Sequence, residues 1–454
     1  MVLSRVDGGP ASRPAALAID SDGTGEACWP FDAAGARMMH HATPGGVMAV
    51  NDESLLRTRL YEWHVEHGAR MMAFAGWSMP VQYGSGVTRE HIATRTGAGL
   101  FDICHMGRFR LTGMDAVSVL AAELTNDARG LAIGRAHYTL LANERGGALD
   151  DAYLYRLGEA DFLLVVNAAN VAADGTRLYA ACMGRSVQFV DVSDELGMVA
   201  LQGPNTDAIL TQVLGADFLP DPARNRLRLG SFRGESVIVA RTGYTGERVG
   251  VEVFVPAKVI LDLWSALVAA GAVPAGLGAR DSLRLEAGLP LHGHELGLDR
   301  QGHDIPIFAH RIARFGVRPT GHGRYVGVDA LDAQRAELAL ILSDALQGAP
   351  KLLPRLIQPI AAFGERRPLR AGYELFHAGE PAGYVTSGTS VPIRDALGAS
   401  AAGARAEAIK MRPIGLACVR SDLRLRPGVE TGVDVFDQRG SLLMRAQLVE
   451  SNLV

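Results

Sequence analysis

Two short stretches of this chain place charged residues directly among glycines and apolar residues. They are residues 242–247 (TGYTGE) and residues 281–288 (DSLRLEAG). In the second stretch Arg284 and Glu286 alternate with leucine and alanine, so we expect some of these charges to be partly buried. A buried charge is costly unless it is paired or bound to a ligand. The chain therefore requires a fold that supplies such partners, or a ligand, in its interior.

At 454 residues the chain is too long for one ordinary core, so two or three domains are expected. An apolar fraction of 48% and a charged fraction of 21% are typical of soluble globular proteins. A net charge of -4 argues against a nucleic-acid partner, and no apolar run is long enough for a membrane span. The four cysteines are scattered without a CxxC pair, which makes a disulfide framework or zinc site unexpected. The default location is therefore the cytoplasm.

Residues 1–50 differ in composition from the rest of the chain. They are rich in Gly, Ala, Pro and Asp and contain few large apolar residues. Such a stretch cannot bury enough surface to offset the entropy of ordering it. The apolar run at residues 15–19 is too short for a secretory signal. We interpret residues 1–50 as a disordered extension, or as sequence upstream of the true start.

From residue 51 to 335 strands and helices mix without a regular βαβ rhythm, which favours an α+β class. From 336 to 454 the helical signals fade and short strands remain between turns, which suggests a β-barrel or sandwich. Residues 350–368, with their prolines and basic residues, are interpreted as an inserted loop. The helices expected from apolar spacing are 54–66, 116–124, 169–183, 206–214 and 258–270. The expected strands are 108–112, 138–141, 152–157, 162–167, 198–202, 236–241, 251–255, 372–376, 383–386, 414–419 and 433–437.

Asp127 follows the expected helix 116–124 and has two interpretations. An Asp just after a helix is usually a cap or turn residue, and from the residues alone this is the favoured one. The alternative is a carboxylate on the wall of a pocket, able to hold a cationic or proton-bearing nitrogen of a substrate. Sequence spacing does not decide between them.

The stretch 243–247 also has two interpretations, which we weigh evenly. Glycines on either side of Tyr244 are typical of a hairpin turn, where Gly supplies positive φ. They also permit close approach of the backbone to a flat ligand, with Glu247 accepting hydrogen bonds from ring N–H groups. The edge of a pterin presents such groups to a carboxylate.

Arg280 and Arg284 lie four residues apart, and thus on one face if the segment is helical. The simpler interpretation is an intrahelical ion pair, such as Asp281 with Arg284. The alternative is a cationic clamp for a ligand carboxylate, for which the guanidinium geometry is suited.

A metal site is not expected. His292 and His294 alternate in a way that would place both on one side of a strand, but no nearby Cys or acid completes a known zinc pattern. Cys104 beside His105 is better explained as a buried structural cysteine than as a nucleophile, because adjacent residues in a strand point to opposite faces.

A series of short motifs occurs along the chain in a specific order. The motifs are GWSMPVQY (76–83), GLFD (99–102), HMG (105–107), ND (126–127), GG to DD (146–151), VNA (166–168), LQGP (201–204) and VTSGT (385–389). Each is weak alone, but in this order they resemble the aminomethyltransferase family, the T-protein of the glycine cleavage system, from about residue 54 to 454. The resemblance implies a three-domain, cloverleaf-like α+β fold: two interleaved α+β domains and a C-terminal β-barrel, with folate in a central channel.

The same resemblance implies a site and a reaction. Asp127 matches the catalytic position, Glu247 the position that binds the pterin, and Arg280 the position that binds the folate tail. Tyr138, Asn167 and Tyr244 match positions that line the site. The implied activity is tetrahydrofolate-dependent aminomethyl transfer from the lipoyl arm of a partner H-protein, which releases ammonia and forms 5,10-methylenetetrahydrofolate.

Some features depart from the family pattern. Residues 309–315 (AHRIARF) replace a region where the family often has Gly-Trp, and the chain stops at Val454, where relatives continue into a short tail. A tetrahydrofolate-dependent demethylase on the same fold is therefore the alternative function. A folate-binding accessory protein of iron–sulfur maintenance is disfavoured, because its Lys-Gly-Cys-Tyr-type motif is absent where residues 284–287 (RLEA) stand. The joint presence of Asp127, Glu247 and Arg280 argues against an inactive homologue.

Overall fold

The structure is a computed structural model that describes residues 54–319, 321, 323–393, 409–426 and 429–450; the predicted extension 1–50 lies outside them. The helices are α1 (Tyr61–Glu66), α2 (Val87–Thr96), α3 (Ala116–Glu123), α4 (Val171–Cys182), α5 (Thr206–Leu214), α6 (Ile260–Ala269), α7 (Leu277–Glu286), α8 (Ala313–Gly316) and α9 (Val328–Leu342). The strands are β1 (Leu56–Arg57), β2 (Arg70–Phe74), β3 (Trp77–Gln82), β4 (Gly99–Asp102), β5 (Gly107–Thr112), β6 (Arg135–Ala142), β7 (Ala148–Gly158), β8 (Asp161–Val166), β9 (Gln188–Asp191), β10 (Leu196–Gln202), β11 (Leu227–Phe232), β12 (Glu235–Ala240), β13 (Gly250–Pro256), β14 (Val273–Pro274), β15 (Arg355–Ala361), β16 (Glu374–His377), β17 (Glu380–Pro392), β18 (Met411–Arg420), β19 (Thr431–Phe436) and β20 (Leu442–Leu448).

Pairing between distant strands shows that two sheets are interleaved along the chain. In the six-stranded sheet, of order β11-β12-β13-β10-β4-β14, strand β4 pairs antiparallel with β10. The residues between these two strands build a separate five-stranded antiparallel sheet of order β6-β7-β8-β5-β9. The predicted interleaving of two α+β parts is therefore confirmed.

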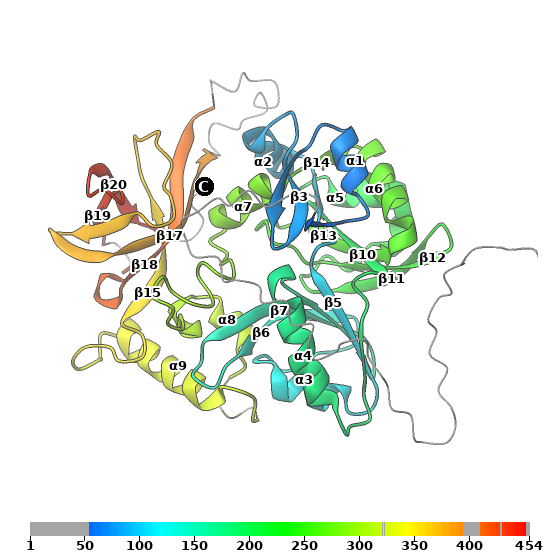
Figure 1. Cartoon of the computed structure of the whole chain (residues 1–454), viewed down its shortest axis with the longest axis horizontal. Helices are drawn as coiled ribbons and strands as arrows, with labels where there is room; N and C mark the ends of the chain where they lie inside the picture. Colours follow the sequence, from blue (N-terminus) through cyan, green and yellow to red (C-terminus); the bar gives the residue numbers. More distant parts are fainter. Residues whose placement is uncertain (1–53, 320, 322, 394–408, 427–428, 451–454) are drawn as a thin grey trace, which may run out of the picture. The chain divides into compact units, whose positions relative to one another are not determined.

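Alternating apolar residues give each sheet its own core. In the five-stranded sheet, Leu154 and Leu164 are fully buried and pack with Leu120 of α3 and Leu178 of α4. Figure 1 shows both helices beside this sheet. The six-stranded sheet is covered in the same way by α6, whose Trp264 is fully buried among its valines. A period of two along a strand and of about 3.6 along a helix puts these side chains on one face.

The C-terminal part is a closed barrel of order β15-β18-β17-β16-β19-β20, in which β15 and β20 close the ring through Ile360 and Leu448. Closure removes the unpaired edges that a flat sheet would expose. The predicted α+β class with a C-terminal β-barrel is confirmed. The limit predicted at residue 335 lies inside α9, so as a domain boundary it stays a prediction.

Helix α7 lies where the sheets and the barrel meet. It contacts α2 and β3 on one side and the barrel strands β17 and β18 on the other (Figure 1). Its Ala279, Leu283 and Leu285 are fully buried. Gly276, just before the helix, allows this approach, because a Cβ there would collide with the backbone of Val81 in β3. The second charged stretch of the sequence is thus placed in the middle of the fold.

Two sequence predictions are wrong. Only residues 61–66 of the predicted helix 54–66 are helical; Leu56 and Arg57 pair instead with β3. Leu56 is 59% exposed whereas Leu60 is fully buried, so only part of the apolar spacing that suggested a helix reflects burial. The predicted loop 350–368 contains the barrel strand β15, in which Pro359 sits opposite Leu416. A proline is unusual inside a strand, and it therefore hid this strand in the sequence. In the structure the neighbouring isoleucines are buried, as expected for a strand of the barrel.

Among the residues that the structure describes, no helix combines the length and the apolar character needed to cross a membrane.

Candidate active site

Asp127 lies in the loop after α3 and serves as its turn residue. Its Oδ1 accepts the backbone N–H of Arg129 (3.1 Å) and its Oδ2 that of Gly130 (3.2 Å). The Nη1 of Arg318 lies 3.8 Å from Oδ1, and the Asp127 side chain is 33% exposed. The turn interpretation is therefore confirmed. One third of the side chain stays accessible to a ligand, so a second, chemical role remains compatible with this geometry.

The neighbouring Asn126 fixes this loop to other parts of the site. Its Nδ2 donates to the carbonyl of Tyr138 (2.8 Å) on β6 and to that of Phe315 (2.9 Å). A Cβ at Gly316 would lie 2.9 Å from the Tyr138 ring, so α8 packs directly on that tyrosine. The segment 309–315, where the sequence departs from the family, thus contacts Asn126 through Phe315 and leads directly into the contact of Gly316 with Tyr138.

Arg318 was not singled out in the sequence, and it supports the Asp127 loop. Its side chain is fully buried and donates to the carbonyls of Ala121 (2.7 Å), Leu124 (2.6 Å) and Thr125 (3.2 Å), which end α3. Burial lowers the pKa of Arg318, while Asp127 acts against this shift. A cation at the C-terminus of a helix is stabilised by the carbonyl dipoles. No local signal could reveal Arg318, since it is remote in sequence from α3.

Tyr138 and Asn167 meet at Asp151, which the sequence analysis named only as part of a family motif and not as a site residue. The Tyr138 hydroxyl donates to Asp151 Oδ2 (3.0 Å), and Asn167 Nδ2 donates to Asp151 Oδ1 (2.8 Å). Burial and the neighbouring Asp150 raise the pKa of Asp151 to about 6. The sequence did contain a signal for this part of the site, because two adjacent acids, at positions 150 and 151, are unusual in an otherwise apolar strand.

A second carboxylate, that of Asp150, also binds Asn167. Asp150 accepts hydrogen bonds from Asn167 Nδ2 and Asn170 Nδ2, both at 2.7 Å. Burial and Asp150 raise the pKa of Asp174, on α4, to about 9. Asp174 is therefore protonated at neutral pH, as expected when two buried carboxyl groups adjoin. The carboxylates of this cluster hold the side-chain amide of Asn167 in position.

Tyr244 and Arg280 are brought together. The guanidinium carbon of Arg280 lies 4.9 Å from the centre of the Tyr244 ring, a cation–π geometry. The Tyr244 hydroxyl donates to the carbonyl of Pro290. Burial lowers the pKa of Arg280, and its buried Nη1 has no hydrogen-bond partner among the described residues. An unsatisfied buried donor of this type suits a ligand carboxylate.

Arg284, four residues later, has a structural role. It pairs with Asp281 (2.8 Å) and Glu295 (3.0 Å) and donates to Ser387 Oγ (3.0 Å) on the barrel strand β17. The intrahelical ion pair predicted from the sequence is confirmed. Of the two arginines on this face, Arg280 is thus the candidate for a ligand clamp.

Glu247 lies in the connection between the antiparallel strands β12 and β13, as the turn interpretation of residues 243–247 requires. Its Oε1 is 2.5 Å from Nη1 of Arg95 on α2, and its side chain is 10% exposed. Arg95 also binds Glu286 at the end of α7. The pterin-binding role of Glu247 stays a prediction, and Arg95 is a partner that sequence analysis missed.

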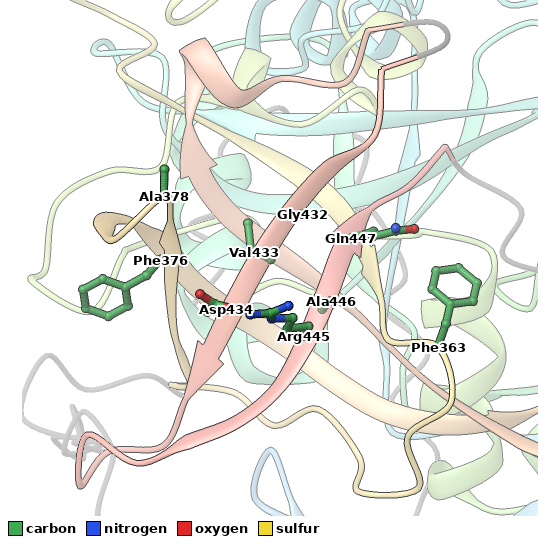
Figure 2. A pocket seen from close by; sticks show the side chains of 9 residues that line it. All are labelled: Phe363, Phe376, Ala378, Gly432, Val433, Asp434, Arg445, Ala446 and Gln447. Atoms are coloured by element: carbon green, nitrogen blue, oxygen red, sulfur yellow. Dashed lines mark ion pairs between the residues drawn. The ribbon is translucent and has the colours of Figure 1, made fainter.

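The structure also contains a pocket away from the residues described above. It has a volume of about 400 Å³, lies on the barrel and is lined by residues of β16, β19 and β20 and by Phe363 and Ala378. Figure 2 shows these side chains. None of the predicted site residues lines the pocket. Its Asp434 is paired with its Arg445, 3.3 Å apart. The cavity therefore lacks the chemistry gathered around α7.

Comparison with known proteins assigns this chain to a family. The family model described as the GCVT N-terminal domain matches residues 60–305, more than half of the chain. An aminomethyltransferase of Thermus thermophilus is 41% identical over 337 residues, covering 74% of this chain and 88% of the relative. The chain belongs to the aminomethyltransferase family.

Other members of the family match over even longer spans. An aminomethyltransferase of Streptomyces coelicolor is 37% identical over 398 residues, covering 86% of this chain and 96% of the relative. The crystal structure of glycine cleavage system aminomethyltransferase T from Bartonella henselae superimposes with a TM-score of 0.70 at 31% identity, covering 88% of this chain and 98% of that one. The family resemblance predicted from the motifs is confirmed, and with it the classification of this chain as a transferase.

Proposed function

We propose that this chain is the tetrahydrofolate-dependent aminomethyltransferase of a glycine cleavage system. The observation that carries the proposal is the family match, together with relatives named aminomethyltransferase over most of the chain. The partner would be a lipoyl carrier H-protein. The buried free cysteines among the described residues suit the reducing cytoplasm that we propose as its location.

The residues around α7 fit a folate. Glu247 offers a nearly buried carboxylate to the N–H edge of a pterin. Tyr244 and Tyr138 offer aromatic surface for the flat ring. Arg280 has a buried, unsatisfied Nη1 that a carboxylate of the folate tail would satisfy. Asn167 is fixed by the two acids 150 and 151, so it can present its amide in a single orientation.

Tetrahydrofolate supplies the nitrogens that accept the methylene carbon of the aminomethyl group, while ammonia and the dihydrolipoyl arm leave. Asp127 would orient the reacting nitrogen and stabilise positive charge that develops during the transfer. Its carboxylate is suited to this because two backbone N–H groups hold it in one position, and one third of the side chain is accessible. A role for Asp127 as proton acceptor is part of the same proposal.

The test is ammonia release from an aminomethylated lipoyl carrier, measured with and without tetrahydrofolate. We expect release to depend on tetrahydrofolate and to be reduced at least about a hundredfold in Asp127→Asn, as is usual when an electrostatic stabiliser is removed. Binding of 5-formyltetrahydrofolate, a stable reduced folate, should survive this substitution. Full turnover in Asp127→Asn would remove both roles assigned to this residue.

The alternative, a demethylase of a small methylated compound, is not favoured by relatives named aminomethyltransferase. It would share the folate site and differ at the substrate entrance, where residues 309–315 depart from the family. Folate binding without any ammonia release from the lipoyl carrier would favour the demethylase.

A further inference from the structure

A buried guanidinium joins two carboxylates that come from distant parts of the chain. Arg95, near the end of α2, has a side chain that is 4% exposed. Its Nη1 binds Glu247 Oε1 (2.5 Å), in the β12–β13 connection, and its Nε binds Glu286 Oε2 (2.6 Å), at the end of α7. Its Nη2 also donates to the carbonyl of Leu283 (3.3 Å). Three separate segments therefore meet at one side chain.

The geometry of this junction constrains Glu247. A guanidinium is planar, and its donors point in fixed directions, so binding Glu286 and Leu283 at one end sets where the remaining donor points. That donor meets Glu247. The second carboxylate is itself fixed, because Glu286 lies 3.3 Å from His91 Nε2, and His91 Nδ1 lies 2.9 Å from Ser282 Oγ on α7. Glu247 is therefore tied to α7, the helix that also carries Arg280.

The charges of this group favour a ligand that donates hydrogen bonds. Burial lowers the pKa of His91, even though Glu286 acts in the opposite direction, so His91 is neutral at pH 7. Within the group formed by Arg95, Glu247, Glu286 and His91, the two carboxylates then share the single positive charge of Arg95. Excess negative charge in a poorly solvated place is stabilised by N–H donors.

We propose that Arg95 is a positioning residue for folate recognition, which sets the orientation of the Glu247 carboxylate relative to Arg280 on α7. This inference rests on the proposed function, because it assumes that Glu247 receives the pterin. Arg95 itself is bound by protein groups and acts through Glu247. Loss of Arg95 should therefore weaken folate binding and have little effect on turnover once the site is saturated.

A double-mutant cycle separates this role from simple stabilisation of the fold. The dissociation constant of 5-formyltetrahydrofolate would be measured for wild type, Arg95→Met, Glu247→Gln and the double variant. We expect each single variant to weaken binding at least about tenfold, the range of one charged hydrogen bond. In the Glu247→Gln background, Arg95→Met should change the constant by less than about twofold.

Controls address stability. Arg424 has a side chain of similar exposure, 6%, and pairs with Asp344 (2.5 Å) beside the barrel, so Arg424→Met should lower thermal stability without changing folate affinity. Arg95→Met leaves both Glu247 and Glu286 without this cation. If this variant does not fold, Glu286→Gln is added to remove one of the two charges, and the cycle is then measured entirely in the Glu286→Gln background.

Three results would contradict parts of the proposal in different ways. A lower melting temperature with unchanged folate affinity in Arg95→Met would make Arg95 a structural residue only. Equal effects of Arg95→Met with and without Glu247→Gln would show that it does not act through Glu247. Unchanged affinity in Glu247→Gln alone would remove the pterin assignment of the proposed function, whatever Arg95 does.

Discussion

Single residues in this protein illustrate how buried charges are accommodated. Arg284, 1% exposed, satisfies its donors with Asp281, Glu295, Ser387 and a carbonyl, whereas Arg280 keeps a buried nitrogen without a described partner. The sequence predicted that such charges are paired or ligand-bound. It could not tell which arginine plays which part, because that depends on Glu295 and Ser387, whose positions relative to α7 are set by tertiary structure.

The buried histidines predict a pH dependence of stability. His310 is 2% exposed, and burial, with Arg311 and Arg284, lowers its pKa to about 3. Between the unfolded value of about 6.5 and the folded value, the unfolded chain binds more protons, so stability falls as pH falls. We expect His310 to contribute a loss in the free energy of unfolding of roughly 1.4 kcal/mol per pH unit below pH 6.

Urea unfolding at pH 7, 6 and 5 would measure this slope in wild type and in His310→Gln. The glutamine amide oxygen can replace Nδ1 as acceptor for the Ile312 N–H without binding a proton. The slope should become shallower but keep its sign, because burial also lowers the pKa values of His105 and His137, each to about 4. Equal slopes for the two proteins would show that His310 is already solvated in the folded state.

Among the elements, those with an apolar face were predictable and those with a polar buried face were not. Helices α3, α4, α5 and α6 follow the predicted ranges within about two residues, the usual uncertainty of helix ends. Helix α2 was not predicted. It buries Glu90, His91 and Thr94, so its sequence shows no apolar stripe. Glu90 accepts the backbone N–H groups of Tyr83 and Gly276, and His91 Nδ1 lies at hydrogen-bond distance from Ser282 Oγ, so these partners come from elsewhere in the fold.

The close approach of α7 to β3 can be tested at Gly276. Its φ is ordinary, so replacement by alanine introduces only a steric conflict with the backbone of Val81, which cannot move like a flexible side chain. We expect Gly276→Ala to lower the free energy of unfolding by roughly 1–3 kcal/mol, the usual range for overpacking. It should also weaken folate binding, since displacement of α7 moves Arg280.

The matched control for that substitution is Gly84→Ala. Gly84 has no described atom within 4 Å of the added Cβ and no positive φ, so its replacement should leave stability and folate affinity unchanged. Thermal unfolding and 5-formyltetrahydrofolate titration would be made on both variants. Equal behaviour of the two would mean that α7 does not need its tight contact with β3.

For the whole molecule, the connection between α7 and the barrel is predicted to carry much of the stability. Arg284→Met removes the cation next to Glu295, which is fully buried, and leaves that carboxylate unpaired. Breaking a buried pair in this way typically costs about 3–5 kcal/mol. We expect a clear loss in urea-unfolding stability and faster limited proteolysis between α7 and the barrel. Adding Glu295→Gln should recover part of the loss; a further loss in the double variant would contradict this explanation.

The class of the fold and its barrel were accessible from the sequence, but the arrangement that builds the site was not. The α+β pattern, the strand-rich C-terminal part and the ordered motifs are local properties. In contrast, Arg95 with Glu286 and Thr125 with Gly316 are hydrogen-bonded pairs separated by 191 residues each. Such partners are fixed only when both sheets are formed, so sequence spacing carries no information about them.

The interleaving of the two sheets has a consequence for synthesis on the ribosome. The five-stranded sheet uses only strands between residues 107 and 191, so it can form soon after that segment emerges. Strand β4, made earlier and buried along its whole length in the finished protein, must wait for β10 and then β14 before both of its edges are paired. Until then it is an apolar, unpaired edge of the type that aggregates. We therefore expect the nascent chain to be most prone to aggregation while the part between β4 and β14 is still being translated.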